Sequence, residues 1–170
     1  MAELAGFGAS TDAHHPTSPL PSGAIAAAAI TSALADGAVG PEEIGYVNAH
    51  ASSTPLNEVA EANALHLALG SHAATVPVSG TKGLYGHALG ASGAVEAAIT
   101  SLALHHGVLP GTCNLATLDP ACHLRVLPAA TPATPDAALS TSFGFGGLNA
   151  ALVLRRSGAG TGAGTQLSAL

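Results

Sequence analysis

Residues 44–69 read IGYVNAHASSTPLNEVAEANALHLAL, and this stretch decides the fold. Its first part, Ile44–Ala49, is mostly apolar with branched and aromatic side chains, which predicts a short buried strand. Thr54 and Pro55 follow a small polar loop and predict the N-cap and the first turn of a helix. We expect that helix to end at Gly70. A buried strand followed by a helix is the building unit of α/β proteins.

Strands and helices alternate along the rest of the chain. Glu58 and Glu61 fall in early turns of the helix that starts at Pro55, where the helix dipole favours acidic side chains. Gly80–Gly86 predicts a glycine-rich loop, and Gly144–Gly147 predicts a turn between two strands. We expect strands at Glu3–Ala9, Ile44–Ala49, Val76–Ser79, Leu124–Leu127, Ala138–Phe143 and Ala150–Leu154, and helices at Gly23–Asp36, Pro55–Leu69 and His87–His106. This order predicts an α/β fold with a mixed sheet covered by helices.

Composition limits the possible functions. The chain has 170 residues, of which 48% are apolar, which is enough for one domain with its own core. We expect that domain at residues 1–156, followed by a disordered Gly/Ser/Thr-rich tail at 157–170. Only four residues are Lys or Arg and the net charge is −6, which argues against nucleic-acid binding and against an anionic membrane surface. Neither a secretory signal nor a membrane-spanning run is present, so we expect a soluble intracellular protein.

Three segments concentrate the residues that can perform chemistry. Asn48–Pro55 places His50 at the end of a predicted strand, where α/β folds bind ligands. Gly80–His87 is glycine-rich and ends in a second histidine, and Ser142–Asn149 carries a glycine turn between two strands. Each segment alone has an ordinary explanation. A histidine at a strand end is usually structural or merely exposed, and a glycine-rich turn is usually only a turn.

Together the three segments resemble motifs of elongating β-ketoacyl-carrier-protein synthases, written Asn-Ala-His-Gly-Thr-Ser-Thr-Pro, Ser-Thr-Lys…Gly-His and Ser-Phe-Gly-Phe-Gly-Gly-Thr-Asn. The resemblance extends over Ala5–Arg155 and includes Gly93–Ala97, which matches a Gly-Ala-Val-Glu-Ala helix of the family. Four residues depart from the motifs: Ala51 stands for Gly, Ser52 for Thr, Gly80 for Ser and Leu148 for Thr. The resemblance implies the C-terminal α-β-α repeat of a thiolase-like fold.

The resemblance also implies an activity: decarboxylative condensation of malonyl-acyl carrier protein with an acyl thioester in fatty-acid biosynthesis, without a cofactor or a metal. His50 and His87 match the family's two catalytic histidines. Two neutral imidazoles that each present an N–H can stabilise the negative charge that decarboxylation places on the thioester oxygen. Lys82 matches the family's lysine, and we expect it to pair with Glu96 behind His87.

Further site residues follow from the same resemblance. Phe145 matches the residue whose backbone N–H joins the acyl oxyanion hole and whose ring gates the acyl pocket. Gly144 and Gly146 let this backbone approach the substrate. Ser52 and Thr54 match positions that hydrogen-bond the phosphopantetheine arm of acyl carrier protein.

The family's nucleophilic cysteine has no counterpart here. Cys113 and Cys122 fit neither its place nor its setting, and they are interpreted as buried or incidental thiols. We therefore expect an incomplete enzyme, the C-terminal half of an acyltransferase that works with an N-terminal half or a homodimer partner. The face that packs on that half should be exposed and apolar.

Two alternatives remain. The chain can be a non-catalytic or split-enzyme subunit whose partner chain supplies the cysteine half. It can also be a metal-binding protein, because it has nine histidines, although the adjacent pairs His14-His15 and His105-His106 lack the spacing of a metal-ligand set. The runs Thr81–Gly83 and His105–Val108 look most like organellar synthases, which indicates a mitochondrion or plastid, or the cytoplasm if the source is bacterial.

Overall fold

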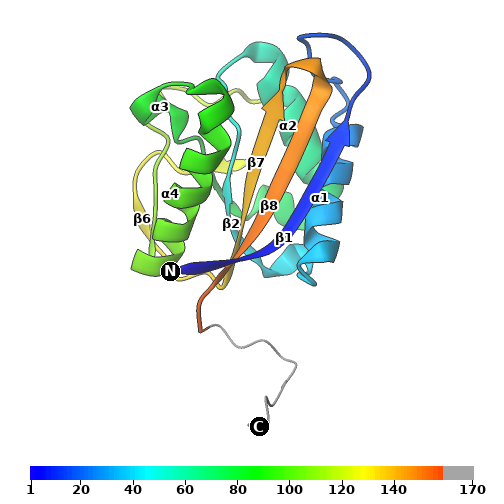
Figure 1. The fold of residues 1–170 in the computed structure, drawn as a ribbon. Helices are drawn as coiled ribbons and strands as arrows, with labels where there is room; N and C mark the ends of the chain where they lie inside the picture. Colours follow the sequence, from blue (N-terminus) through cyan, green and yellow to red (C-terminus); the bar gives the residue numbers. More distant parts are fainter. Residues whose placement is uncertain (159–170) are drawn as a thin grey trace, which may run out of the picture.

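A six-stranded mixed sheet forms the centre of the molecule (Figure 1). The structure is a computed structural model that describes residues 1–158. Strand β8 is antiparallel to both of its neighbours, β1 and β7, whereas β7, β2, β3 and β5 are parallel to one another. The strands, in sheet order, are β1 (Ala2–Thr11), β8 (Leu148–Arg156), β7 (Ala137–Gly144), β2 (Ile44–Asn48), β3 (Pro77–Ser79) and β5 (Arg125–Val126). A separate antiparallel pair joins β4 (Val108–Leu109) to β6 (Thr131–Pro132).

Three helices cover the two faces of this sheet. Helices α1 (Ala24–Asp36) and α2 (Pro55–Leu69) lie on one face, and α4 (Ser92–His106) lies on the other (Figure 1). Alternate side chains of the central strands enter the two cores. Leu139 and Val153 belong to the core under α1 and α2, whereas their neighbours Ala138 and Leu154 belong to the core under α4. This period of two gives three layers, α-β-α.

The predicted order of strands and helices is confirmed, with three corrections. The expected loop Gly80–Gly86 contains a short helix, α3 (Lys82–Tyr85). The helix expected from His87 begins instead at Ser92, after a 3-10 turn at Leu89–Ala91. Leu89 has φ of +50°, outside the right-handed helical region, so the chain cannot run on as a helix from His87.

The third correction concerns the start of α2. Thr54 occupies the N-cap position, but its side chain makes no capping hydrogen bond. Its hydroxyl lies instead 3.1 Å from Ser52 Oγ. At the other end of the chain, β8 runs to Arg156, and most of the tail expected at 157–170 lies outside the described residues.

The strands that carry the candidate residues end at one edge of the sheet. Since β8 is antiparallel to both β1 and β7, strand β1 points the same way as β7, β2 and β3. His50 therefore follows β2 at the same edge where Lys82 follows β3 and where β7 ends at Gly144. Carboxyl edges of this kind are where α/β proteins bind ligands.

An apolar strip is exposed on the β1–β8 side of the sheet. Phe7 of β1 pairs with Leu152 of β8. Leu148, four residues before Leu152 on β8, lies on the same face of the sheet. Phe7 is 53% exposed and Leu148 is 61% exposed. These two exposed apolar side chains lie beside the edge where the candidate residues gather. That they belong to a face that packs on an N-terminal half stays a prediction.

The core makes a stability prediction. Leu139 is fully buried in the central strand β7, and Leu139→Ala should lower the free energy of unfolding by about 2–5 kcal/mol because it removes buried contacts and leaves a cavity. Leu67 on α2 is 61% exposed, so Leu67→Ala should change stability by less than about 0.5 kcal/mol. Urea denaturation of both variants measures this difference. Equal losses would contradict the assignment of Leu139 to the core.

Candidate active site

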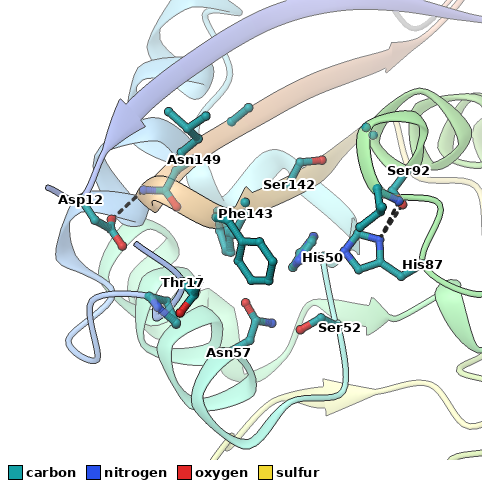
Figure 2. A pocket seen from close by; sticks show the side chains of 18 of the residues that line it. Asp12, Thr17, His50, Ser52, Asn57, His87, Ser92, Ser142, Phe143 and Asn149 are labelled. Carbon is teal, nitrogen blue, oxygen red and sulfur yellow. Dashed lines mark hydrogen bonds between the residues drawn. The ribbon is translucent and has the colours of Figure 1, made fainter. Parts of the chain in front are cut away.

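A cavity of about 860 Å³ opens at the carboxyl edge of the sheet (Figure 2). Its walls come from the end of β1, the loops after β2 and α3, the start of α4, and the β7–β8 turn. Six of the predicted site residues line it: His50, Ser52, Thr54, His87, Gly144 and Phe145. The structure thus brings residues from all three motifs to one cavity.

The two candidate histidines face each other. The ring centroids of His50 and His87 are 5.4 Å apart, with the planes at 79°. His50 is buried, with 6% of its surface exposed, whereas His87 is exposed. The expected convergence of these two side chains is confirmed, and their catalytic roles remain predictions.

The hydrogen-bond partners of the rings decide which nitrogen carries the proton. The Lys82 ammonium has only donors to offer, and Nζ lies 3.4 Å from His50 Nδ1. The backbone N–H of Leu89 donates to His87 Nδ1 at 3.2 Å, and Ser92 Oγ lies 2.9 Å from the same atom. Both Nδ1 atoms are therefore acceptors, and each neutral ring carries its hydrogen on Nε2. The two rings thus offer two N–H donors.

Lys82 is a buried cation with its contacts inside the protein. Its ammonium forms an ion pair with Glu96 and donates to the backbone carbonyl of His50. Lys82 is 6% exposed and Glu96 is fully buried, so the expected pair is confirmed. The histidine that the ammonium contacts is His50, because β3, which leads into Lys82, lies beside β2, which leads into His50. The expected place of the pair behind His87 stays a prediction.

Electrostatics keep His50 neutral. Burial, together with smaller effects of the neighbouring Lys82 and His87, lowers the pKa of His50 to about 3. Burial also raises the pKa of Glu96, and the hydrogen bond and charge of Lys82 oppose that rise. His50 is therefore uncharged over the physiological pH range and remains a neutral N–H donor.

Glu61 has a structural role that the sequence reasoning missed. We expected only a helix-dipole effect, but the carboxylate is buried and accepts four hydrogen bonds. Oε1 accepts from the His50 backbone N–H at 2.8 Å and from the Thr141 hydroxyl at 2.7 Å. Oε2 accepts from the Ala51 backbone N–H at 2.8 Å and from Asn57 Nδ2 at 3.3 Å. Burial raises the pKa of Glu61, and bonds from Ala51, Thr141 and His50 oppose this.

Phe143 was also missed as a site residue. Its ring centroid lies 6.0 Å from that of His50, and both rings line the cavity (Figure 2). The sequence carried one usable signal, since Phe143 stands inside the Ser142–Asn149 motif. No sequence pattern predicts Glu61 as a site residue. Its position eleven residues after His50 does not reveal that its carboxylate accepts hydrogen bonds from the His50 loop.

The turn that carries Phe145 is fastened to the loop after β1. Asn149 Nδ2 donates to Asp12 Oδ1 at 2.7 Å, and the Gly146 N–H donates to the carbonyl of Pro16 at 2.6 Å. Gly146 has φ of +78°, a conformation that favours glycine. Phe145 is 73% exposed and lines the cavity. Its position suits a side chain at an entrance, and its gating role remains a prediction.

Neither cysteine reaches this cavity. Cys113 is exposed, and Cys122 is buried with Sγ 3.7 Å from the carbonyl oxygen of Glu58. Burial and the nearby carboxylates of Asp119, Glu58 and Glu61 raise the pKa of Cys122, which disfavours the reactive thiolate.

The described part of the chain has neither a cluster of metal ligands nor a membrane-spanning helix. Within residues 1–158, no group of three or more His, Cys, Asp or Glu side chains is arranged to hold a metal ion. In the same residues, no helix has the length and apolar character needed to cross a bilayer.

This architecture and this cavity agree with the comparisons to known proteins. Residues 1–116 match the family described as beta-ketoacyl synthase, C-terminal domain, and the chain belongs to this family. The chain is 44% identical over 155 residues to 3-oxoacyl-[acyl-carrier-protein] synthase 2 of Synechocystis sp., covering 91% of this chain and 37% of that protein. It is 47% identical over 156 residues to the mitochondrial 3-oxoacyl-[acyl-carrier-protein] synthase of Arabidopsis thaliana, covering 89% of this chain and 34% of that protein.

Solved structures show the same fold. A type II polyketide ketosynthase in complex with its acyl-carrier protein superposes with a TM-score of 0.87 at 34% identity, covering 91% of this chain and 38% of that chain. The ishigamide ketosynthase/chain length factor also gives a TM-score of 0.87, at 37% identity, covering 92% of this chain and 38% of that chain. The predicted thiolase-like α/β fold is confirmed. The chain spans little more than a third of the length of these relatives.

Glu61 provides a first test of the site. Glu61→Gln should lower the free energy of unfolding by about 2–4 kcal/mol, because an amide N–H₂ would face backbone N–H groups that cannot turn away. Glu3→Gln, at an exposed position of β1, is the matched control and should stay within about 0.5 kcal/mol of wild type. Denaturant titration measures both. A Gln variant as stable as the control would contradict the described hydrogen bonds.

His50 provides a pH-dependent test. The unfolded chain takes up a proton on His50 near pH 6.5, whereas the folded chain does so only at about pH 3, so stability falls as pH falls through this window. His50→Gln should flatten that fall by up to about 1.4 kcal/mol per pH unit. The exposed His106 is the control, and His106→Gln should keep the wild-type slope. Unfolding free energies measured across the window check this, and an unchanged slope in His50→Gln would refute a neutral buried His50.

Proposed function

We propose that this chain supplies the two-histidine half of a β-ketoacyl-acyl carrier protein synthase. The observation that carries the proposal is the convergence of His50 and His87, whose Nε2–H groups are both free to donate. Donors that are already fixed can stabilise a developing oxyanion without reorganising. The match to the synthase family supports the same conclusion.

The proposed reaction starts from a malonyl thioester. Its C–C bond to the carboxylate breaks, carbon dioxide leaves, and the electron pair moves onto the thioester oxygen as an enolate. His50 and His87 donate hydrogen bonds to that oxygen and so stabilise the charge. The enolate carbon then attacks an acyl group held as a thioester on a cysteine, a C–C bond forms, and the cysteine leaves as a thiolate.

The other candidate residues serve this chemistry by position. Lys82 and Glu96 form a buried pair against His50 that fixes its ring. Burial, with the Lys82 charge adding to it, keeps that ring neutral. The backbone N–H of Phe145 is proposed to bind the acyl oxygen, with Gly144 and Gly146 shaping the turn. Ser52 and Thr54 line the cavity with two hydroxyls 3.1 Å apart, which suits contacts with the phosphopantetheine arm.

The proposed partners complete the site. Neither cysteine lines the cavity, so the nucleophile must come from the portion of a synthase that the match does not cover, or from a partner chain. The exposed side chains of Phe7 and Leu148 on the β1–β8 side of the sheet suit that contact. Substrates arrive on acyl carrier protein, since one structural neighbour is a ketosynthase bound to such a protein.

A second candidate function is a non-catalytic subunit. The observation that favours it is the lack of a thiol on the cavity, and one neighbour pairs a ketosynthase with a chain length factor. For either function, we propose that the chain works in the soluble phase of a mitochondrion, a plastid or a bacterial cytoplasm, since the relatives are bacterial and mitochondrial synthases.

The experiment adds malonyl- and acyl-acyl carrier protein to residues 1–170, with and without a polypeptide that carries the cysteine half of a relative. We expect β-ketoacyl product only with that polypeptide. His50→Asn and His87→Asn should each reduce product formation about 10²–10³-fold, because each removes one oxyanion donor. His106→Asn, at an exposed position on the last turn of α4, should retain full activity.

Two outcomes would contradict this assignment. Product formed by the chain alone, unaffected by Cys113→Ser with Cys122→Ser, would show that the reaction needs no added cysteine half. An active mixture in which both histidine variants match wild type would show that the cavity is not the catalytic site and would favour the non-catalytic subunit.

A further inference from the structure

Two small residues meet between the loops that carry His50 and Lys82. Ala51 follows His50, and Gly80 lies two residues before Lys82. A Cβ atom added to Gly80 would lie 2.6 Å from Cβ of Ala51, closer than two carbon atoms can approach without a shift of the chain. The next neighbours of that added Cβ are the Ala51 oxygen and Thr112 Cγ2, both at 3.9 Å, which is ordinary contact. Only the Ala51 methyl group therefore excludes a side chain at residue 80.

Neither loop is free to yield. The Ala51 N–H is held by Glu61 Oε2 at 2.8 Å, and the Gly80 N–H is held by Thr112 Oγ1 at 3.1 Å. Ala51 also has φ of +40°, where a residue with a Cβ atom is strained. The chain tolerates that strain with a methyl group turned toward Gly80.

We propose that residues 51 and 80 are a pair of positioning residues that share one side-chain space, so that a single group between the two loops sets the distance from the Lys82 ammonium to the His50 ring. The catalytic meaning of this spacing rests on the proposed function, whereas the exclusion itself does not. With both positions filled, the loops must separate, and the contacts from Lys82 Nζ to the His50 carbonyl and Nδ1 must weaken.

A double-mutant cycle on the full chain tests the exclusion. Gly80→Ala should lower the melting temperature by at least about 4 °C, because it overpacks a held contact. Ala51→Gly with Gly80→Ala moves one methyl group across the contact and should bring the melting temperature back to within about 2 °C of wild type. Gly90→Ala is the matched control for adding a methyl group at a glycine, since an added Cβ there meets no atom within 4 Å.

A spectroscopic measurement tests the positioning. The titratable groups around His50 are Lys82, His87, Glu61 and, through Lys82, Glu96. In wild type the imidazole ¹⁵N shifts of His50 should stay constant between about pH 5 and pH 8, as expected for a neutral buried ring. In Gly80→Ala the weaker contact from Lys82 Nζ should move the Nδ1 shift of His50 away from its wild-type value, and the double variant should restore that value.

The outcomes separate cleanly. Recovery of both melting temperature and His50 shifts in the double variant supports the pair, whether or not the reconstituted mixture condenses acyl groups. A double variant no more stable than Gly80→Ala would overturn the shared space. Destabilisation by Gly80→Ala with unchanged His50 shifts would overturn the positioning role. If the melting temperatures and the His50 shifts behave as expected but the reconstituted wild-type mixture forms no β-ketoacyl product, only the proposed function is contradicted.

Discussion

The Lys82 ammonium is the charge on which the site depends. It is buried, and it is neutralised by Glu96 while its remaining hydrogen atoms point at His50. A buried cation without its partner costs about 3–5 kcal/mol, so the fold must keep Glu96, Lys82 and His50 in contact. That requirement ties α4, which carries Glu96, to the loops after β2 and β3. Burial keeps the His50 ring neutral, and the charge of the neighbouring Lys82 adds to that effect.

A second buried charge fixes the same loop from the opposite side. Glu61 accepts the backbone N–H groups of His50 and Ala51 and the hydroxyl of Thr141, and so joins α2, the His50 loop and β7. His50 is thus held through its backbone N–H by a carboxylate and at its ring by an ammonium group. Buried ionic groups are stable only when their hydrogen bonds are satisfied, which gives both contacts little freedom to vary.

Most of the fold could be predicted from the sequence because apolar periodicity and glycine breaks are local signals. The strand at Ile44, the helix from Pro55 and the final hairpin all follow from such signals. Sequence motifs predicted His50, His87 and Lys82 as site residues. Sequence reasoning failed at Leu89, whose left-handed conformation comes from the packing of the turn, and at Glu61 and Phe143, whose roles depend on contacts between distant segments. It did not predict the contact between Lys82 and His50, because the order of strands in the sheet is a tertiary property.

The pairing of the first strand with the last has a consequence for how the chain folds. β1 begins at Ala2 and its hydrogen-bonded partner β8 ends at Arg156, so this ladder closes a loop of nearly the whole described chain. Contacts of such long sequence separation form slowly, since the entropy of closing the loop must be overcome first. During synthesis β1 has no hydrogen-bonded strand partner until β8 has left the ribosome, whereas α1, which follows it directly, can already pack on one of its faces. The Phe145 turn, fastened to the loop after β1, can take its final shape only after β8 has emerged.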